Sequence, residues 1–212
     1  MKHIKPSFLQ ISILIVVVTH LVGMIGFVSP WQELFISLTP IHLLLSAGLL
    51  LANQEDKNKT FWFAVVGLMA AGYLIELIGI QTGVIFGEYS YDRALGPKIG
   101  GTPPIIGVNW MMLVVAVAAL ISRIKTPFVI KAMLGAMALV GIDYLIEPVA
   151  IAYDFWHWHQ TTVPTHNYLG WLITAFIFFG VYLSVVKNKA NPLALVLLLM
   201  QIVFFGVLNF TV

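Results

Sequence analysis

Seven apolar runs constrain the fold of this chain more than any other feature of its sequence. A transmembrane helix needs about 20 apolar residues, and backbone groups in hydrocarbon must be satisfied within their own segment. The runs do not alternate apolar with polar residues, so they favour helices over barrel strands. They are approximately Phe8–Val28, Leu34–Leu51, Phe61–Thr82, Val108–Ile121, Pro127–Ile146, Tyr168–Val186 and Pro192–Phe210.

Composition supports a membrane protein. With 60% hydrophobic and 9% charged residues, the chain has too little polar surface to coat a soluble globule. We therefore expect one integral, multi-pass membrane domain over residues 1–212, an all-α bundle of about seven transmembrane helices. The short fourth run is expected to extend into the preceding loop.

Charge and cysteine content exclude several classes of function. The net charge of +2 is small, so nucleic acid is not an expected partner, whereas membrane lipids are. The absence of Cys excludes disulfides, thiolate nucleophiles and Cys-ligated zinc. The oligomeric state is left open by the sequence.

Basic residues predict the topology. The first run lacks an Ala-x-Ala-like cleavage site, so we interpret it as a retained helix. Seven crossings place Arg93 and Lys98 on one side of the membrane. The other basic residues then share the opposite side: Lys2, Lys5, Lys57, Lys59, Arg123, Lys125, Lys131, Lys187 and Lys189. This asymmetry predicts a cytoplasmic N-terminus and an outer C-terminus, in a bacterial or archaeal cell membrane.

Polar side chains interrupt the apolar runs at a shared depth. At a rise of 1.5 Å per residue, four of them lie roughly 9–15 Å below the outer boundary. These four are Glu76, Asp143, His20 and His42, while Glu147 and Asn109 lie nearer to it. Ionisable groups in lipid are costly and usually functional. Hydrogen bonding between helices is an equally good explanation for the two histidines.

Asp143 and Glu147 are four residues apart, so a helix points both carboxyls along one face. No lysine or arginine lies at their depth, and two such carboxyls cannot both ionise cheaply in an apolar setting. We expect at least one carboxylic acid to stay protonated near neutral pH. Pro148 is expected to end or kink the helix there and to reorient Glu147. The alternative is that these acids only bond neighbouring helices, or that Glu147 is solvated.

The stretch from 79 to 110 is expected to form a stiff, folded cap. Gly79, Gly83 and Gly87 recur every four residues, a spacing that favours close helix packing. These glycines match neither a phosphate-binding loop nor a dinucleotide fingerprint.

A second group of side chains resembles a metal site only weakly. It consists of Asp154, His157, His159 and His166. Because Trp156 and Trp158 flank these histidines, we interpret them as interfacial residues and expect no metal.

The residues from the third to the sixth run resemble a known family, the membrane-embedded carotenoid-biosynthesis proteins that include carotenoid hydratases. The matching motifs are Glu76-x-x-Gly79-x-x-Thr82-Gly83-x-x-Phe86-Gly87-x-Tyr89-x-Tyr91, Leu95-Gly96, Pro103, Asn109-Trp110, Asp143-x-x-x-Glu147-Pro148 and Asn167-Tyr168-x-Gly170-Trp171. The resemblance implies hydration of a terminal isoprenoid double bond in an acyclic or monocyclic carotenoid, a lipid-soluble substrate. The product would be a tertiary alcohol.

Hydration of such an alkene needs a proton donor, a pocket that tolerates a tertiary cation, and a positioned water. Asp143, Glu147 and Glu76 are the predicted catalytic carboxyls, with Asp143 or Glu147 as the acid and Glu76 orienting the water. Aromatic faces stabilise cations. The predicted substrate-binding residues are Tyr89, Tyr91, Asn109, Trp110, Trp156, His20 and His42. The expected reaction uses no metal or redox cofactor.

Other functions stay open at this point. A carotenoid cyclase starts from the same protonation and differs only in what captures the cation. A proton-coupled transporter also uses buried carboxyls, but the sequence has no convincing internal repeat. An intramembrane metal hydrolase would use the histidines with Asp143 or Glu76. A retinal-type receptor is disfavoured because the one lysine inside a run, Lys131, lies near an end.

Overall fold

The computed structural model describes residues 7–212 and confirms that the chain is all-α. Its helices are α1 (Phe8–Phe27), α2 (Gln32–Ser37), α3 (Thr39–Ala52), α4 (Lys59–Thr82), α5 (Ile105–Ile121), α6 (Phe128–Ala152), α7 (Thr165–Val185) and α8 (Ala194–Leu208). Two short strands, β1 (Tyr89–Tyr91) and β2 (Trp156–Trp158), pair in the connections. Four helices, α1, α4, α6 and α7, are long and apolar enough to cross a membrane.

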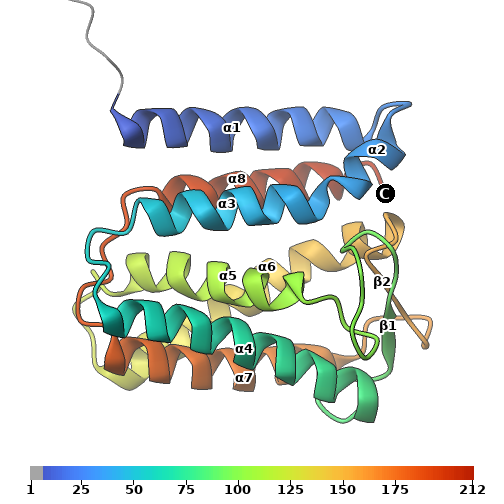
Figure 1. Ribbon diagram of the computed structural model, residues 1–212. Coiled ribbons are helices and arrows are strands. Elements are labelled where there is room, and N and C mark those ends of the chain that lie inside the picture. Colours follow the sequence, from blue (N-terminus) through green and yellow to red (C-terminus); the bar gives the residue numbers. More distant parts are fainter. Residues whose placement is uncertain (1–6) are drawn as a thin grey trace, which may run out of the picture.

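The long helices run side by side in stacked layers (Figure 1). α1 lies along one edge next to α3 and α8, and α4 and α7 lie along the other edge. α5 and α6 lie between these layers. Almost every residue of α5 is buried, which makes it the central helix of the bundle.

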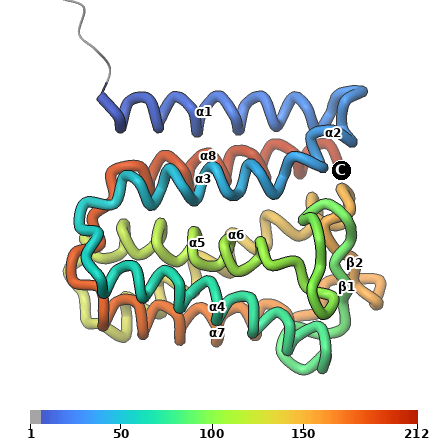
Figure 2. The backbone as a smooth tube through the Cα atoms, viewed as in Figure 1, coloured from blue at the N-terminus to red at the C-terminus, as the bar shows by residue number. Residues whose placement is uncertain are grey.

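The chain enters and leaves the two ends of the bundle alternately (Figure 2). The α3–α4, α5–α6 and α7–α8 connections share one end, which carries Lys57, Arg123 and Lys187. The opposite end holds both strands and the C-terminus. Lys2 and Lys5, which also supported the predicted topology, lie outside the described residues.

Local sequence signals set the helix ends. Ser7 caps α1 in a capping box with Gln10. Asn58 Oδ1 accepts a hydrogen bond from the Phe61 amide at 2.9 Å and caps α4. α4 ends where Gly83 adopts a left-handed φ of 66°. Gly83 and Gly87, whose φ is 106°, therefore lie in the turn after α4, so the prediction that they pack helices is wrong.

One expected boundary agrees with the structure and two differ from it. The fourth run extends back to Ile105, as expected. The second run breaks at Leu38 into α2 and α3, with Pro40 in the first turn of α3. α6 continues through Pro148 to Ala152, so the helix does not end there. In that turn the side-chain amide of Asn209, the residue that follows α8, donates to the Leu145 carbonyl at 2.7 Å. Such contacts from a neighbouring helix help a proline to stay within a helix.

Candidate functional site

A cavity of about 430 Å³ lies within the bundle at the end that carries the strands. Its wall is mostly apolar and includes side chains from α1, α3, α4, α5, α6, α7 and α8. The predicted site residues that line it are His20, His42, Glu76, Tyr89, Tyr91, Asn109, Asp143, Glu147 and Trp156. The structure therefore gathers nine of the ten predicted side chains around one space.

Glu76 on α4 is buried and accepts three hydrogen bonds. Trp110 Nε1 on α5 donates to its Oε1 at 2.9 Å, and Tyr91 Oη donates to its Oε2 at 2.8 Å. Tyr89 Oη also donates to Oε2. Trp110 is the predicted residue that does not line the cavity; it lies behind Glu76 and fixes the carboxyl in place.

Two glycines of α4 make room for side chains around Glu76. A Cβ on Gly72 would lie 2.6 Å from the Trp110 Cβ, so only glycine lets the indole approach at that turn. Gly79 leaves space for Phe86, whose ring would lie 2.8 Å from an added Cβ, while the Tyr89 hydroxyl at 3.7 Å would remain at an ordinary contact distance. Gly72, Glu76 and Gly79 share one face of the helix because three or four residues make one turn.

Glu147 on α6 is also buried and well supplied with donors. Trp156 Nε1 and Trp158 Nε1 donate to its Oε2 at 3.1 and 2.9 Å. The Asn167 amide on α7 donates to its Oε1 at 3.2 Å. Glu147 is 2% exposed, so the alternative that it is solvated at the interface does not hold in this structure.

Asp143 lies one turn before Glu147 and has fewer donors. The Asn167 amide donates to Asp143 Oδ2 at 2.8 Å, which makes Asn167 a bridge between the two carboxyls. Asp143 Oδ1 is buried and has no hydrogen-bond partner among residues 7–212. A buried polar atom without a partner is costly. This oxygen is therefore the natural place for a proton or for a hydrogen bond from a small molecule in the cavity.

The two strands explain why four aromatic donors meet the carboxyls. β1 and β2 are antiparallel, with Tyr89 opposite Trp158 and Tyr91 opposite Trp156. Residues directly opposite each other share one face of a sheet, and all four rings turn into the cavity. Burial, and then the neighbouring Glu76, raise the pKa of Tyr89 and of Tyr91 well above its usual value, so both hydroxyls remain donors.

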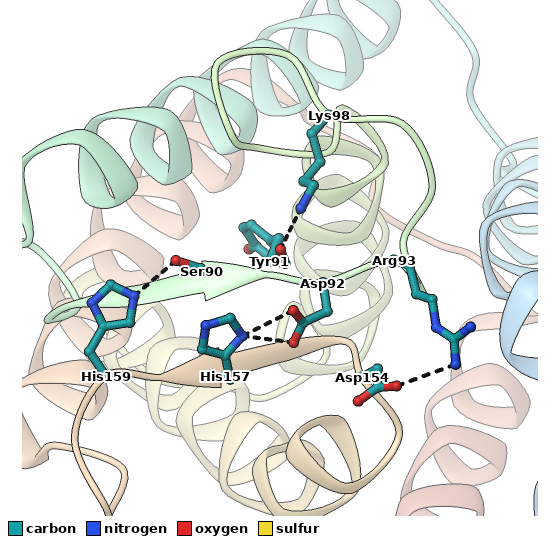
Figure 3. Close-up of polar contacts among 8 residues, drawn as sticks. All are labelled: Ser90, Tyr91, Asp92, Arg93, Lys98, Asp154, His157 and His159. Atoms are coloured by element: carbon teal, nitrogen blue, oxygen red, sulfur yellow. Dashed lines mark hydrogen bonds and ion pairs between the residues drawn. The ribbon is translucent and has the colours of Figure 1, made fainter.

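The predicted weak metal group is dispersed: Asp154, His157 and His159 lie in or beside β2, whereas His166 lies on α7 and contacts the Val84 carbonyl. His157 Nδ1 pairs with the Asp92 carboxylate at 2.9 Å, and His159 Nε2 contacts Ser90 Oγ at 2.9 Å (Figure 3). Asp154 instead faces Arg93 at 3.5 Å. Within residues 7–212, no three His, Asp or Glu side chains are grouped as metal ligands. These contacts secure the cap on the side opposite the carboxyls.

The α1, α3 and α8 side of the cavity carries uncharged polar groups. His20 Nδ1 lies 2.8 Å from the Val16 carbonyl, and His42 Nε2 lies 3.2 Å from Thr19 Oγ1. The two imidazole rings meet edge to face with centroids 4.5 Å apart. Gln201 Oε1 on α8 is buried without a partner in the described part of the chain. Asn109 makes no side-chain hydrogen bond to residues 7–212, so its amide is available to a ligand.

Three residues that line the cavity were not among the predicted site residues. Asn167 and Trp171 belong to a segment that carried the family resemblance, but neither was assigned a role. Trp158 was identifiable because alternate residues of an extended strand face the same way, as Trp156 and Trp158 do. Trp171 stacks on Trp110 with ring centroids 4.1 Å apart and lines the cavity.

Comparison with known proteins gives two matches. A family model described as "Carotenoid biosynthesis protein" matches residues 31–212. The chain is also 30% identical over 119 residues to a bisanhydrobacterioruberin hydratase from Haloarcula japonica. That alignment covers 52% of this chain and 41% of the relative, so it spans less than half of that protein. No solved structure matches the chain significantly.

Proposed function

Because the chain belongs to the carotenoid biosynthesis protein family, we propose that it is a carotenoid hydratase that adds water to a terminal isoprenoid double bond. The observation that carries this proposal is a mostly apolar cavity whose wall holds three buried carboxyls. An acid, anionic groups and aromatic rings in an apolar space suit a reaction that passes through a carbocation. The hydratase relative supports the same reaction class.

Asp143 is the proton donor in this proposal. Glu76 and Glu147 each accept three hydrogen bonds, which stabilise a carboxylate at these two positions more than at Asp143. Asp143 accepts one, and its Oδ1 is unpaired among the described residues. A proton on this oxygen gives the cavity a carboxylic acid whose Oδ1 makes no hydrogen bond to any of the described residues.

In the proposed reaction, side chains of this chain account for every proton that is given or taken. Asp143 Oδ1 gives its proton to the less substituted carbon of the terminal double bond, and the more substituted carbon becomes a tertiary cation. The carboxylates of Glu76 and Glu147 and the faces of Tyr89 and Trp156 stabilise that charge. A water molecule attacks the cation and releases one proton, which returns to Asp143.

Polar groups in the cavity favour a hydratase over a cyclase in this proposal. They are Asn109 and the polar side chains of α1, α3 and α8. A cyclase must keep water away from the cationic carbon, because an internal double bond has to capture the cation. Here the Asn109 amide and the Gln201 carbonyl face the cavity without protein partners among residues 7–212. These groups can hold the nucleophilic water near the reacting carbon.

We further propose that all seven long and medium helices cross the membrane, with the N-terminus in the cytoplasm. α3, α5 and α8 are apolar but shorter than a usual span. Each of these three helices nevertheless runs between the two ends of the bundle, as the four long helices do (Figure 2). Glycosylation or cysteine-labelling scans of the connections test this topology.

Expression in a carotenoid-accumulating host, with mass spectrometry of the pigments, tests the function. A product heavier than its precursor by one water supports a hydratase, and unchanged mass with altered retention indicates a cyclase. Asp143→Asn removes the acid with little change of shape, so turnover should fall by about 10²–10⁴-fold. Glu76→Gln should lower turnover as well, because it removes a charge opposite the cation.

The control variant is Glu55→Gln, an exposed acid at the opposite end of the bundle. It should hydrate carotenoid as the unaltered chain does. Infrared spectra provide a check that is independent of turnover: a carboxylic acid band should disappear in Asp143→Asn and persist in Glu76→Gln. Full turnover by both of these variants would overturn the proposed roles.

A further inference from the structure

The cavity is closed on the side of the carboxyls and open on the opposite side. Five of the side chains that line it are exposed, by 39–61%. All five belong to α1, or to α3 and the residue that precedes it: Val18, Val22, Leu38, Ile41 and Leu45. Every other lining residue is buried or partly buried. We call these five residues the α1–α3 mouth.

The chemistry of the α1–α3 mouth suits hydrocarbon and not water. Its five side chains are all aliphatic, and α1 lies at the outer edge of the bundle (Figure 1). α1 is a candidate membrane span, and only 17% of its apolar window is buried inside the protein. The α1–α3 mouth lies between this candidate span and the shorter apolar helix α3, and an opening beside a helix that crosses a bilayer leads into its acyl chains.

The volume of the cavity limits what can enter. Pockets of about 300–1,000 Å³ enclose drug-sized ligands, and this cavity of about 430 Å³ lies near the lower limit. A carotenoid is a long, stiff polyene, and its length exceeds that of a compact cavity of this volume. One end group therefore fits against the carboxyls, and the rest of the polyene must leave through an opening.

We propose that the α1–α3 mouth is the lateral entrance through which a carotenoid inserts one end group from the bilayer. The remainder of the polyene stays in the lipid, in contact with Val22 and Ile41. This inference rests on the proposed function for the identity of the occupant. It adds the path of the substrate and the number of end groups that the site holds at one time.

Tryptophan substitutions at matched positions test the entrance. Val22→Trp and Ile41→Trp place a large ring in the α1–α3 mouth. Leu21→Trp and Leu44→Trp are the controls, because Leu21 and Leu44 are similarly exposed on the same two helices but do not line the cavity. We expect roughly a tenfold or larger loss of kcat/KM in each mouth variant. The controls should match the unaltered chain.

Thiol labelling provides a second, reversible block. The chain contains no Cys, so Ile41→Cys and Leu44→Cys each introduce the sole reactive thiol. A bulky, cleavable disulfide reagent should stop turnover at position 41 and spare it at position 44, and reduction should restore it. Restored activity shows that the labelled protein had not unfolded.

The amount of carotenoid that copurifies with the protein tests the entrance independently of the proposed function. Mouth variants should bind less pigment than their controls, whether or not the unaltered chain hydrates it. If the unaltered chain binds pigment but forms no hydrated product, the hydratase proposal fails. The entrance is then tested by pigment binding alone. Equal binding and equal turnover in mouth and control variants would overturn the entrance.

Discussion

At the scale of single residues, the site is defined by how unevenly hydrogen-bond donors are shared among three carboxyls. Glu76 and Glu147 each receive three donors, while Asp143 shares one amide with Glu147. Carboxylates buried without donors are strongly unfavourable. Four aromatic side chains of the β1–β2 ribbon therefore have a polar role as well as an apolar one.

Tyr91→Phe tests this role through stability. The change removes a 2.8 Å hydrogen bond to the buried Glu76 carboxyl and leaves the ring in place. Hydrogen bonds to charged groups are worth about 1.5–3 kcal/mol, so the free energy of unfolding should fall by about that amount. Denaturant unfolding in detergent micelles measures it. Tyr144→Phe is the control, because Tyr144 is 65% exposed and makes no side-chain hydrogen bond within residues 7–212. Equal free energies of unfolding for the two variants would contradict the stabilising role of the Tyr91 hydrogen bond.

At the scale of elements, close contacts between helices position the site. Gly107 on α5 faces α4, where a Cβ would lie 2.2 Å from the Met69 carbonyl oxygen. Because backbone cannot move aside as a side chain does, Gly107→Ala should separate α4 from α5 and lower the free energy of unfolding by about 1–3 kcal/mol. Gly141→Ala on α6 is the matched control, since nothing lies within 4 Å of its added Cβ. That change should be neutral or stabilise α6 by about 0.5–1 kcal/mol. A Gly107→Ala variant as stable as Gly141→Ala would show that α4 and α5 do not need this approach.

The helices were predictable from sequence and the ribbon was not. Long apolar stretches determine helices in lipid because no other local structure satisfies the backbone there. Strands of three residues, such as Tyr89–Tyr91, carry too short an alternation to be recognised, and their pairing joins segments far apart in the chain. The path of α6 through Pro148 also depends on tertiary contacts, among them the Asn209 amide.

At the scale of the whole molecule, depth along the helices was the sequence signal that anticipated the site. His20, Glu76 and Asp143 lie on three different helices, and a shared depth was enough to predict that they meet around one space. Depth alone says nothing about which helices are neighbours. For that reason the role of Asn167 and the position of the α1–α3 mouth were not predictable before the bundle was known.

The proposed hydratase with a single lateral entrance predicts an order of products. In that proposal, a symmetrical acyclic carotenoid keeps its second end in the bilayer while its first end reacts in the 430 Å³ cavity. The molecule must leave through the α1–α3 mouth and return reversed before its other end can be hydrated. Mono-hydrated carotenoid should therefore appear first, accumulate, and be consumed as the doubly hydrated product forms. A time course by liquid chromatography and mass spectrometry measures this order, and dilution with fresh substrate should increase the mono-hydrated share. Doubly hydrated product from the earliest times, without a free intermediate, would mean that both ends are processed in one binding event and would contradict the proposed single entrance.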